Sequence, residues 1–245
     1  MAQLLSPSAL LDVWDKGMSL SAIDRALLLL ATGFPHVSTA TLAQQSIGQR
    51  NQQLLILRER LFGAEFACTA ICPQCTERLE FRFAITDIMA QPSAVSTETL
   101  RVEQDGYTVE FRLPNSNDLL ALPQEQDETL LEQELLARCL LSARQAEDAV
   151  SLVALPPTII TAITAAMEQA DSQANIELAL TCPTCSHLWQ ALLDLPTFMW
   201  RELDAWARRV LVEVHLLASA YGWHEQDILN MRPWRRQFYL GMISR

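Results

Sequence analysis

The sequence predicts an α+β fold that is rich in helices and carries three short β-hairpins. Apolar residues recur at helical spacing near both ends of the 245-residue chain. Two Cys-Pro-x-Cys (CPxC) motifs each stand between segments in which apolar and polar residues alternate, and an Asp-Gly pair joins two further alternating segments. The chain has only seven glycines, which also favours a helix-rich fold.

The first region, residues 1–64, is expected to be helical. A Ser-Pro pair begins a helix over 7–17, because proline suits the first helical position. Ser21 is placed to cap a second helix over 22–32. A third helical region is expected over 42–61, with leucines on its apolar face. The arginines expected to face outward in this region are Arg50, Arg58 and Arg60.

The cysteines of the two CPxC motifs are the strongest candidates for a functional site. They are Cys72, Cys75, Cys182 and Cys185. Two thiolate pairs at this spacing close a four-sulfur tetrahedral site around Zn²⁺ and leave no open position, which favours architecture over catalysis. Because an alternating segment precedes and follows each motif, we expect two hairpins with the motifs at their tips. This arrangement is that of a zinc ribbon with a long insertion between its halves.

Other interpretations of these cysteines remain open at this point. A redox-active CxxC pair normally begins a helix, whereas a predicted strand follows each pair here. Disulfides are disfavoured in a reducing cytosol, and iron is an alternative to zinc for four thiolates. We expect Cys68 and Cys139 to be small buried apolar residues, and His187 to lie outside the ligand set.

The ribbon-like region is expected to span residues 65–195, with a helical insertion over about 115–172. Asp105-Gly106 is a two-residue turn signal and predicts the small additional hairpin. Further helices are expected over 119–122, through 135–141 and from Pro157 to Met167.

The third region, residues 196–245, is expected to consist of amphipathic helices, and all three regions to form one compact unit. Apolar residues recur over 197–221 at alternating spacings of four and three, and Gly222 ends that helix. Seven arginines and four tryptophans lie in this region, a composition typical of interface hot spots, although tryptophans in a core would fit as well. The candidate partner-binding residues are Arg208, Arg209, Trp223, Trp234, Arg235, Arg236 and Tyr239.

The composition argues against several classes of function. A net charge of −11 disfavours general binding to nucleic acid, because the phosphate backbone repels an acidic protein. No apolar run reaches the length of a membrane span and no secretory signal is visible, so we expect a cytoplasmic protein. There is no phosphate-binding glycine loop, nucleophile elbow or HExxH motif, and the four histidines are scattered. We therefore expect neither enzymatic activity nor a small-molecule substrate.

Several segments together resemble one known family. They are Leu5-Ser6-Pro7 with Leu10-Leu11 and Trp14, Ser46 through Asn51, Leu57 through Gly63, the two CPxC motifs, Glu202 through Ala207, Ala220 through Trp223, Asp227 through Leu229 and Trp234 through Leu240. With these segments the chain resembles the T4-type baseplate hub assembly proteins of contractile phage tails, in the branch found with extracellular contractile injection systems. The CPxC motifs and the C-terminal segments are the distinctive part of the resemblance.

The resemblance implies a non-enzymatic protein that helps to build the baseplate hub, either as a chaperone in the cytoplasm or as a component that stays in the particle. Its partners would be hub or spike proteins of the baseplate. The resemblance brings no catalytic residues, and the zinc site rests on the four cysteines rather than on relatedness. The alternative from another class is a zinc-ribbon adaptor in transcription or RNA metabolism, which would need a basic face around the cysteines.

Overall fold

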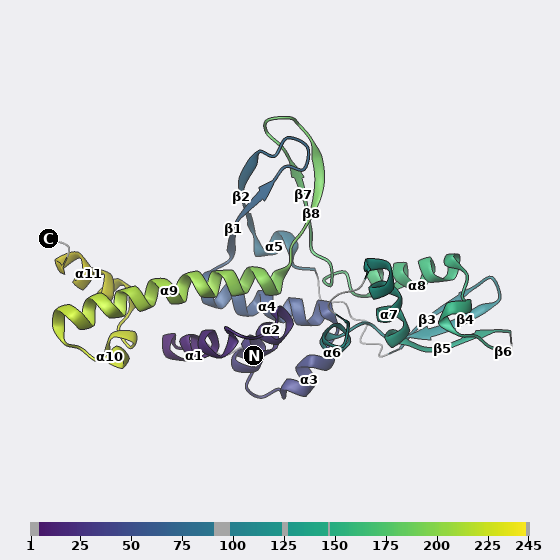
Figure 1. Ribbon diagram of the computed structural model, residues 1–245, viewed down its shortest axis with the longest axis horizontal. Coiled ribbons are helices and arrows are strands. Elements are labelled where there is room, and N and C mark those ends of the chain that lie inside the picture. Colours follow the sequence, from purple (N-terminus) through teal and green to yellow (C-terminus); the bar gives the residue numbers. More distant parts are fainter. Residues whose placement is uncertain (1–4, 91–98, 124–126, 147, 244–245) are drawn as a thin grey trace. The chain divides into compact units, whose positions relative to one another are not determined.

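The computed structural model describes residues 5–90, 99–123, 127–146 and 148–243 (Figure 1). Packing divides the chain into two compact units, the first comprising Met1–His36 with Leu195–Arg245 and the second Val37–Asp194. The α+β class is confirmed, because helices predominate and the strands form small antiparallel sheets. Within the described residues, no helix combines the length and the apolar character that crossing a bilayer requires.

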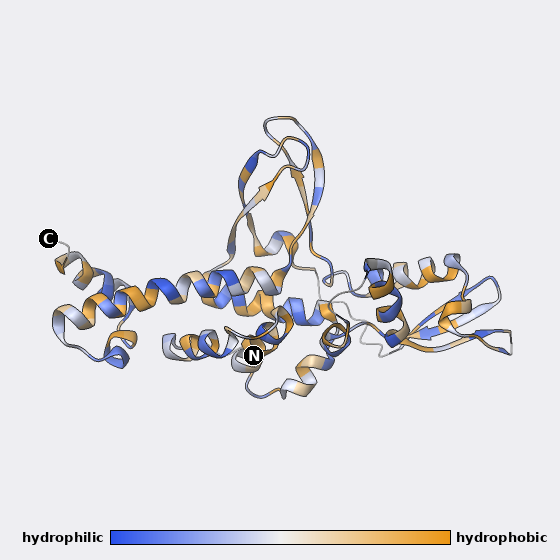
Figure 2. Ribbon diagram, in the orientation of Figure 1, coloured by the Kyte–Doolittle hydropathy of each residue, from blue (hydrophilic) through white to orange (hydrophobic). Residues whose placement is uncertain are grey.

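The first unit is built from helices of both chain ends. They are α1 (Pro7–Gly17), α2 (Ala22–Gly33), α9 (Leu195–Tyr221), α10 (Glu225–Leu229) and α11 (Pro233–Ile243). Helix α9 contacts each of the other four, and Figure 2 shows hydrophobic and hydrophilic residues alternating along it, as an amphipathic helix requires. Residues of α1, α9 and α10 form one apolar core, which contains Leu11, Ala207, Val210, Val214, Leu217, Ile228 and Leu229.

The predicted N-cap of α2 is present, and α1 is capped by Ser6 directly before the proline that was expected to begin it. The Ser6 hydroxyl accepts the N–H of Ala9 at 3.2 Å, and the Ser21 hydroxyl accepts the N–H of Asp24 at 3.1 Å. Because α1 and α2 pack on α9, they share a unit with the C-terminal helices rather than with the rest of residues 1–64. The two units therefore divide the chain differently from the three consecutive regions expected from the sequence.

The second unit holds the remaining helices and all the described strands. Its helices are α3 (Thr39–Gln44), α4 (Ile47–Phe62), α5 (Ile85–Ile88), α6 (Ser116–Leu120), α7 (Glu128–Cys139) and α8 (Pro157–Ala170), with the 3₁₀ turn η1 (Leu152–Ala154). Its strands are β1 (Glu65–Ile71), β2 (Arg78–Ala84), β3 (Leu100–Gln104), β4 (Tyr107–Phe111), β5 (Leu140–Gln145), β6 (Asp148–Ala149), β7 (Glu177–Thr181) and β8 (Leu188–Leu192).

The predicted additional hairpin is part of a larger antiparallel sheet with the order β3-β4-β5-β6. Asp105 and Gly106 join β3 to β4 with positive φ angles of 51° and 79°, as a type I′ turn requires. A helix through residue 141 was expected, but α7 ends at Cys139 and the chain continues as β5. The reason is tertiary, since β5 pairs with β4 and places Ala143 in the core between the sheet and α8.

The helical region expected over 42–61 is interrupted by Gln45 and Ser46. The Ser46 hydroxyl accepts the N–H of Gln49 and the Gln49 side chain accepts the N–H of Ser46, a capping box that begins α4 as a new helix. The expectation that Arg50 and Arg58 face outward was wrong, because both are buried. Arg58 donates to the carbonyls of Gly63 and Glu65, each at 2.6 Å, and so fixes the path from α4 into β1.

Candidate metal centre

The cysteine motifs lie at the tips of two antiparallel hairpins, as predicted. Strand β1 pairs with β2, and β7 pairs with β8, as two separate two-stranded sheets that lie side by side (Figure 1). Burial alternates along the strands, which leaves one face of each hairpin half-buried. Phe66 is fully buried and stacks on its cross-strand partner Phe83 at a centroid distance of 4.8 Å.

The two tips share one backbone geometry. In the first, the N–H of Cys72 donates to the carbonyl of Glu77 and the N–H of Thr76 donates to the carbonyl of Cys72, both at 2.9 Å. In the second, Cys182 makes the same two bonds with His187 and Ser186, again at 2.9 Å. The tips are therefore local repeats that present their sulfurs in the same way.

A left-handed residue follows the second cysteine of each motif. Thr76 has a φ of 58° and Ser186 a φ of 60°, in a region that residues other than glycine seldom occupy. Backbone strain of this kind is retained where the surroundings determine the geometry. Sequence reasoning did not identify these two positions, although a hydroxyl residue directly after each CPxC motif was a visible signal.

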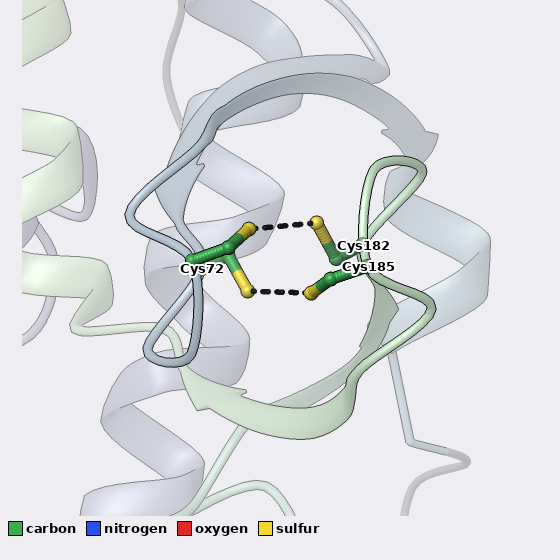
Figure 3. A group of neighbouring side chains, drawn as sticks. Cys72, Cys182 and Cys185 are labelled. Carbon is green, nitrogen blue, oxygen red and sulfur yellow. Dashed lines mark hydrogen bonds between the residues drawn. The ribbon is translucent and has the colours of Figure 1, made fainter.

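All four predicted sulfurs come together between the two tips (Figure 3). They lie within 4.8 Å of one another, with Sγ distances of 3.7 Å from Cys72 to Cys185 and 3.5 Å from Cys75 to Cys182. A tetrahedron of sulfurs at the Zn–S distance of about 2.3 Å has edges of about 3.8 Å. The separations are far longer than a disulfide bond of about 2.05 Å. The four residues therefore fit a tetrathiolate metal site.

The electrostatics of the cluster also favour a bound cation. The pKa of Cys182 is lowered to about 6, mainly because the backbone N–H of Cys185 stabilises its thiolate. The pKa of Cys75 is raised to about 12, since desolvation and the three neighbouring sulfurs outweigh the backbone N–H of Glu77. A bound metal cation would hold all four sulfurs as thiolates.

The remaining cysteines lie outside the cluster. Cys68 is half-buried on β1 opposite Phe81, and Cys139 is buried at the end of α7, where burial raises its pKa to about 11. Among the described residues, only the four cysteines of the CPxC motifs form a group that could hold a metal ion. His187 contributes its carbonyl to the second tip, and its ring stacks beside Trp189 at 6.0 Å.

The candidate partner-binding residues take different positions in the first unit. Arg208 and Arg209 are exposed on α9, and Trp234 and Arg235 are exposed on α11. Trp223 and Tyr239 are half-buried against each other, edge to face, with ring centroids 4.8 Å apart. These last two aromatic residues thus serve largely to pack α11.

Arg236 requires a correction, because its guanidinium is not available to a partner. The residue is 3% exposed, and its Nε donates to Oε2 of Glu213 at 2.9 Å. Arg236 also donates to the carbonyl of Met231, while Gln237 donates to the other oxygen of Glu213. The residue fastens α11 to α9.

Sequence reasoning missed several exposed apolar side chains beside these arginines. Trp234, Phe238 and Met242 follow one another at spacings of four on α11 and are 67%, 60% and 52% exposed. Val212 and Leu216 are exposed on α9, next to Arg208 and Arg209. The regular spacing of the α11 residues was the signal that could have revealed this face.

Comparison with known proteins gives one match. A family model described as T4 bacteriophage base plate protein matches residues 35–200, which include both hairpins and all four cysteines. No curated protein and no solved structure matches the chain. The matched segment covers more than half of the 245 residues, and the chain therefore belongs to the T4 bacteriophage base plate protein family.

Proposed function

We propose that this protein is a non-enzymatic baseplate hub assembly protein of a contractile, phage-tail-like injection system. The observation that carries the proposal is the base plate family match over residues 35–200. The same family supports baseplate proteins as partners and an architectural rather than a catalytic role. The proposal goes beyond the family match where it names hub and spike proteins as partners and assigns a chaperone-like activity.

We further propose that the four clustered cysteines bind a structural Zn²⁺. The sulfur separations of 3.5 and 3.7 Å support it, and four thiolates fill a tetrahedral coordination shell. The β1–β2 and β7–β8 hairpins share no backbone ladder. A metal at the tips would therefore join them where hydrogen bonds do not. Elemental analysis of protein purified without added metal should return about one zinc per chain, and iron in its place would revise the metal but not the site.

The hub partner is proposed to dock on the exposed surface of α9 and α11. Arg208, Arg209, Val212 and Leu216 line a groove of about 540 Å³ together with Leu240 of α11. Exposed apolar area beside arginines suits the core of a protein interface. Arg209→Glu should weaken capture of hub components at least tenfold while leaving the zinc content unchanged. Loss of zinc in this variant would mean that the arginine has a structural role.

The alternative of an adaptor in transcription or RNA metabolism gains no support from the hairpins. Their exposed charges include Glu65, Glu77, Glu80 and Glu177 against Arg78 and Arg82, so the region around the cysteines carries no excess of positive charge. A nucleic-acid-binding ribbon would need such an excess.

Quantitative mass spectrometry of purified particles from a strain with a tagged copy tests the role in assembly. A chaperone acting in the cytoplasm is absent from finished particles but captures hub components from the lysate. A structural subunit is present at a fixed ratio to the hub. Absence from the particles together with failure to capture any baseplate component would overturn the proposal.

A further inference from the structure

The second unit contains a groove with an apolar floor and an acidic rim. Its floor includes the half-buried side chains of Ile47, Leu135, Leu136, Ile160 and Met167, and its volume is about 640 Å³. Pockets of roughly 300–1,000 Å³ with apolar walls are typical binding sites. Helices α7 and α8 form its two sides, and the segment after α8 completes it.

The rim of this groove is negative. Glu132 on α7, Glu168 on α8 and Glu177 on β7 are exposed. Asp171, in the segment that leads from α8 to β7, also lines the groove. Among the described residues that line the groove, none is an arginine, lysine or histidine. A ligand that fits must therefore bring apolar side chains flanked by positive charge.

One element of this same chain has that composition. Helix α11 has two apolar faces: Tyr239 and Leu240 pack against the core of the first unit, whereas Trp234, Phe238 and Met242 point away from it. Arg232 and Arg235 are exposed beside this second face. A helix that is apolar on both sides is either buried or carries an interaction surface on its exposed side. We call the three residues Trp234, Phe238 and Met242 the outer stripe.

We propose that the outer stripe of one copy of this protein binds in the acidic groove of a second copy. The apolar floor would receive Trp234 and Phe238, as an amphipathic helix enters a hydrophobic groove, while Arg232 and Arg235 meet Glu132 and Glu168 on the rim. The stripe and the groove are different surfaces in different units, so the contact is heterologous: in a pair, one copy retains a free groove and the other a free stripe, to which further copies can add. This inference depends on neither the metal nor the hub partner.

Self-association of this kind would have a consequence for assembly. In each contact the outer stripe of one copy is covered while that copy stays associated, and it becomes available when the copy dissociates. A protein of net charge −11 with a basic apolar helix would thereby avoid nonspecific contacts before its partner arrives.

Sedimentation velocity on the full chain, over ~1–200 μM at low salt, measures the association. We expect species heavier than the 27.5 kDa monomer that increase with protein concentration and decrease with added salt. The double variants Arg232→Glu/Arg235→Glu and Glu132→Arg/Glu168→Arg should each lower the association constant at least tenfold. An equimolar mixture of the two variants should restore it, because each supplies the reversed charge that the other needs.

Matched controls separate this contact from a general effect of charge. Arg201→Glu on α9 and Asp148→Arg on β6 change exposed charges outside both surfaces and should leave association within about twofold of wild type. A photo-crosslinker at position 234, in a mixture of isotopically labelled and unlabelled chains, should link a labelled chain to residues 132–177 of an unlabelled one.

Three results would overturn the proposal. The first is a protein that stays monomeric at every concentration, even if its groove is found to bind a hub protein. The second is association that survives both double variants. The third is a set of crosslinks that all stay within one chain.

Discussion

The backbone N–H of Gly48 donates a hydrogen bond of 2.9 Å to Oδ2 of Asp171, although 123 residues separate the two in the chain. Beside it, the Asn51 amide donates to the carbonyls of Gln173 and Ala174. The start of α4 thus holds the segment that leads from α8 into β7, and the end of α4 leads directly into β1. Both hairpins of the metal centre are therefore anchored on one helix.

Gly48→Ala should destabilise the protein by about 1–2 kcal/mol. A Cβ at this position would collide with the Asp171 carboxylate and approach the backbone N of Ala174 at 3.0 Å. The cost of overpacking, about 1–3 kcal/mol, exceeds the gain of somewhat less than 1 kcal/mol that alanine brings to a helix. Urea unfolding measures the difference.

Gly241→Ala on α11 is the matched control for this substitution. No atom lies within 4 Å of the Cβ it would add, so only the helix propensity should count and the variant should be slightly more stable. Equal effects of the two alanines would contradict the importance of the contact between Gly48 and Asp171.

The metal centre is the part of the molecule that the sequence predicted best. Short spacing between cysteines and alternation in the flanking strands are local signals, and local signals determined both hairpins. Only their meeting at one point required tertiary structure. The left-handed Thr76 and Ser186 were missed because neither residue type normally marks that conformation, and the only signal was that a hydroxyl residue follows both motifs.

Features that depend on distant partners were the ones missed. Leucine is a good helix former, so Leu140 and Leu141 read as helical, yet pairing with β4 makes them a strand. The expectation that Arg50 and Arg58 face outward rested on their charge alone. Burial of Arg58 depends on the carbonyls of Gly63 and Glu65 and on the Phe66 ring, which lies 3.8 Å from its guanidinium carbon.

Cys182→Ser should release the metal and unfold the two hairpins. Structural zinc contributes binding free energy on the order of 10 kcal/mol, and here it would join two hairpins that share no ladder. Hydrogen exchange should therefore speed up in β1, β2, β7 and β8 while the core of α9 and α10 stays protected. A chelator added to the wild type should reproduce this pattern.

Cys68→Ala tests whether that effect belongs to the cluster. Cys68 lies on β1 near the motif but outside the four sulfurs, so this variant should keep its zinc and its exchange pattern. If Cys182→Ser melts like the wild type and neither protein contains metal, the zinc proposal fails.

Asp118→Asn should lower stability at neutral pH, and the loss should vanish in acid. Arg112 donates to both oxygens of Asp118, at 2.6 and 2.7 Å. Burial raises the pKa of Asp118, but the hydrogen bonds from Arg112 and from the N–H of Asn115 outweigh it, and the pKa is lowered from 3.8. The carboxylate therefore contributes stability above the unfolded pKa, and this contribution is lost as the pH falls through the folded pKa.

Thermal unfolding of the two proteins between pH 7 and pH 2.5 checks the sign. We expect Asp118→Asn to cost about 1–3 kcal/mol at pH 7 and the difference to shrink below a pH of about 4. Asp148→Asn, at an exposed carboxylate, should stay within about 0.5 kcal/mol of wild type throughout. A constant difference across the whole range would show that the charge of Asp118 does not matter.

Arg236→Ala should release α11 from α9. The substitution leaves Glu213 buried without its cation, and breaking a buried pair from one side costs about 3–5 kcal/mol. Arg235→Ala, one residue earlier and exposed, should cost less than about 1 kcal/mol.

Replacing both members of the buried pair with apolar residues, Arg236→Met with Glu213→Leu, should restore much of the lost stability, because no buried charge then remains. Urea unfolding, together with hydrogen exchange of α11, shows which of the two arginines holds α11 on α9. If Arg235→Ala proved the more destabilising, α11 would be held by its outer side and the buried pair would not be its anchor.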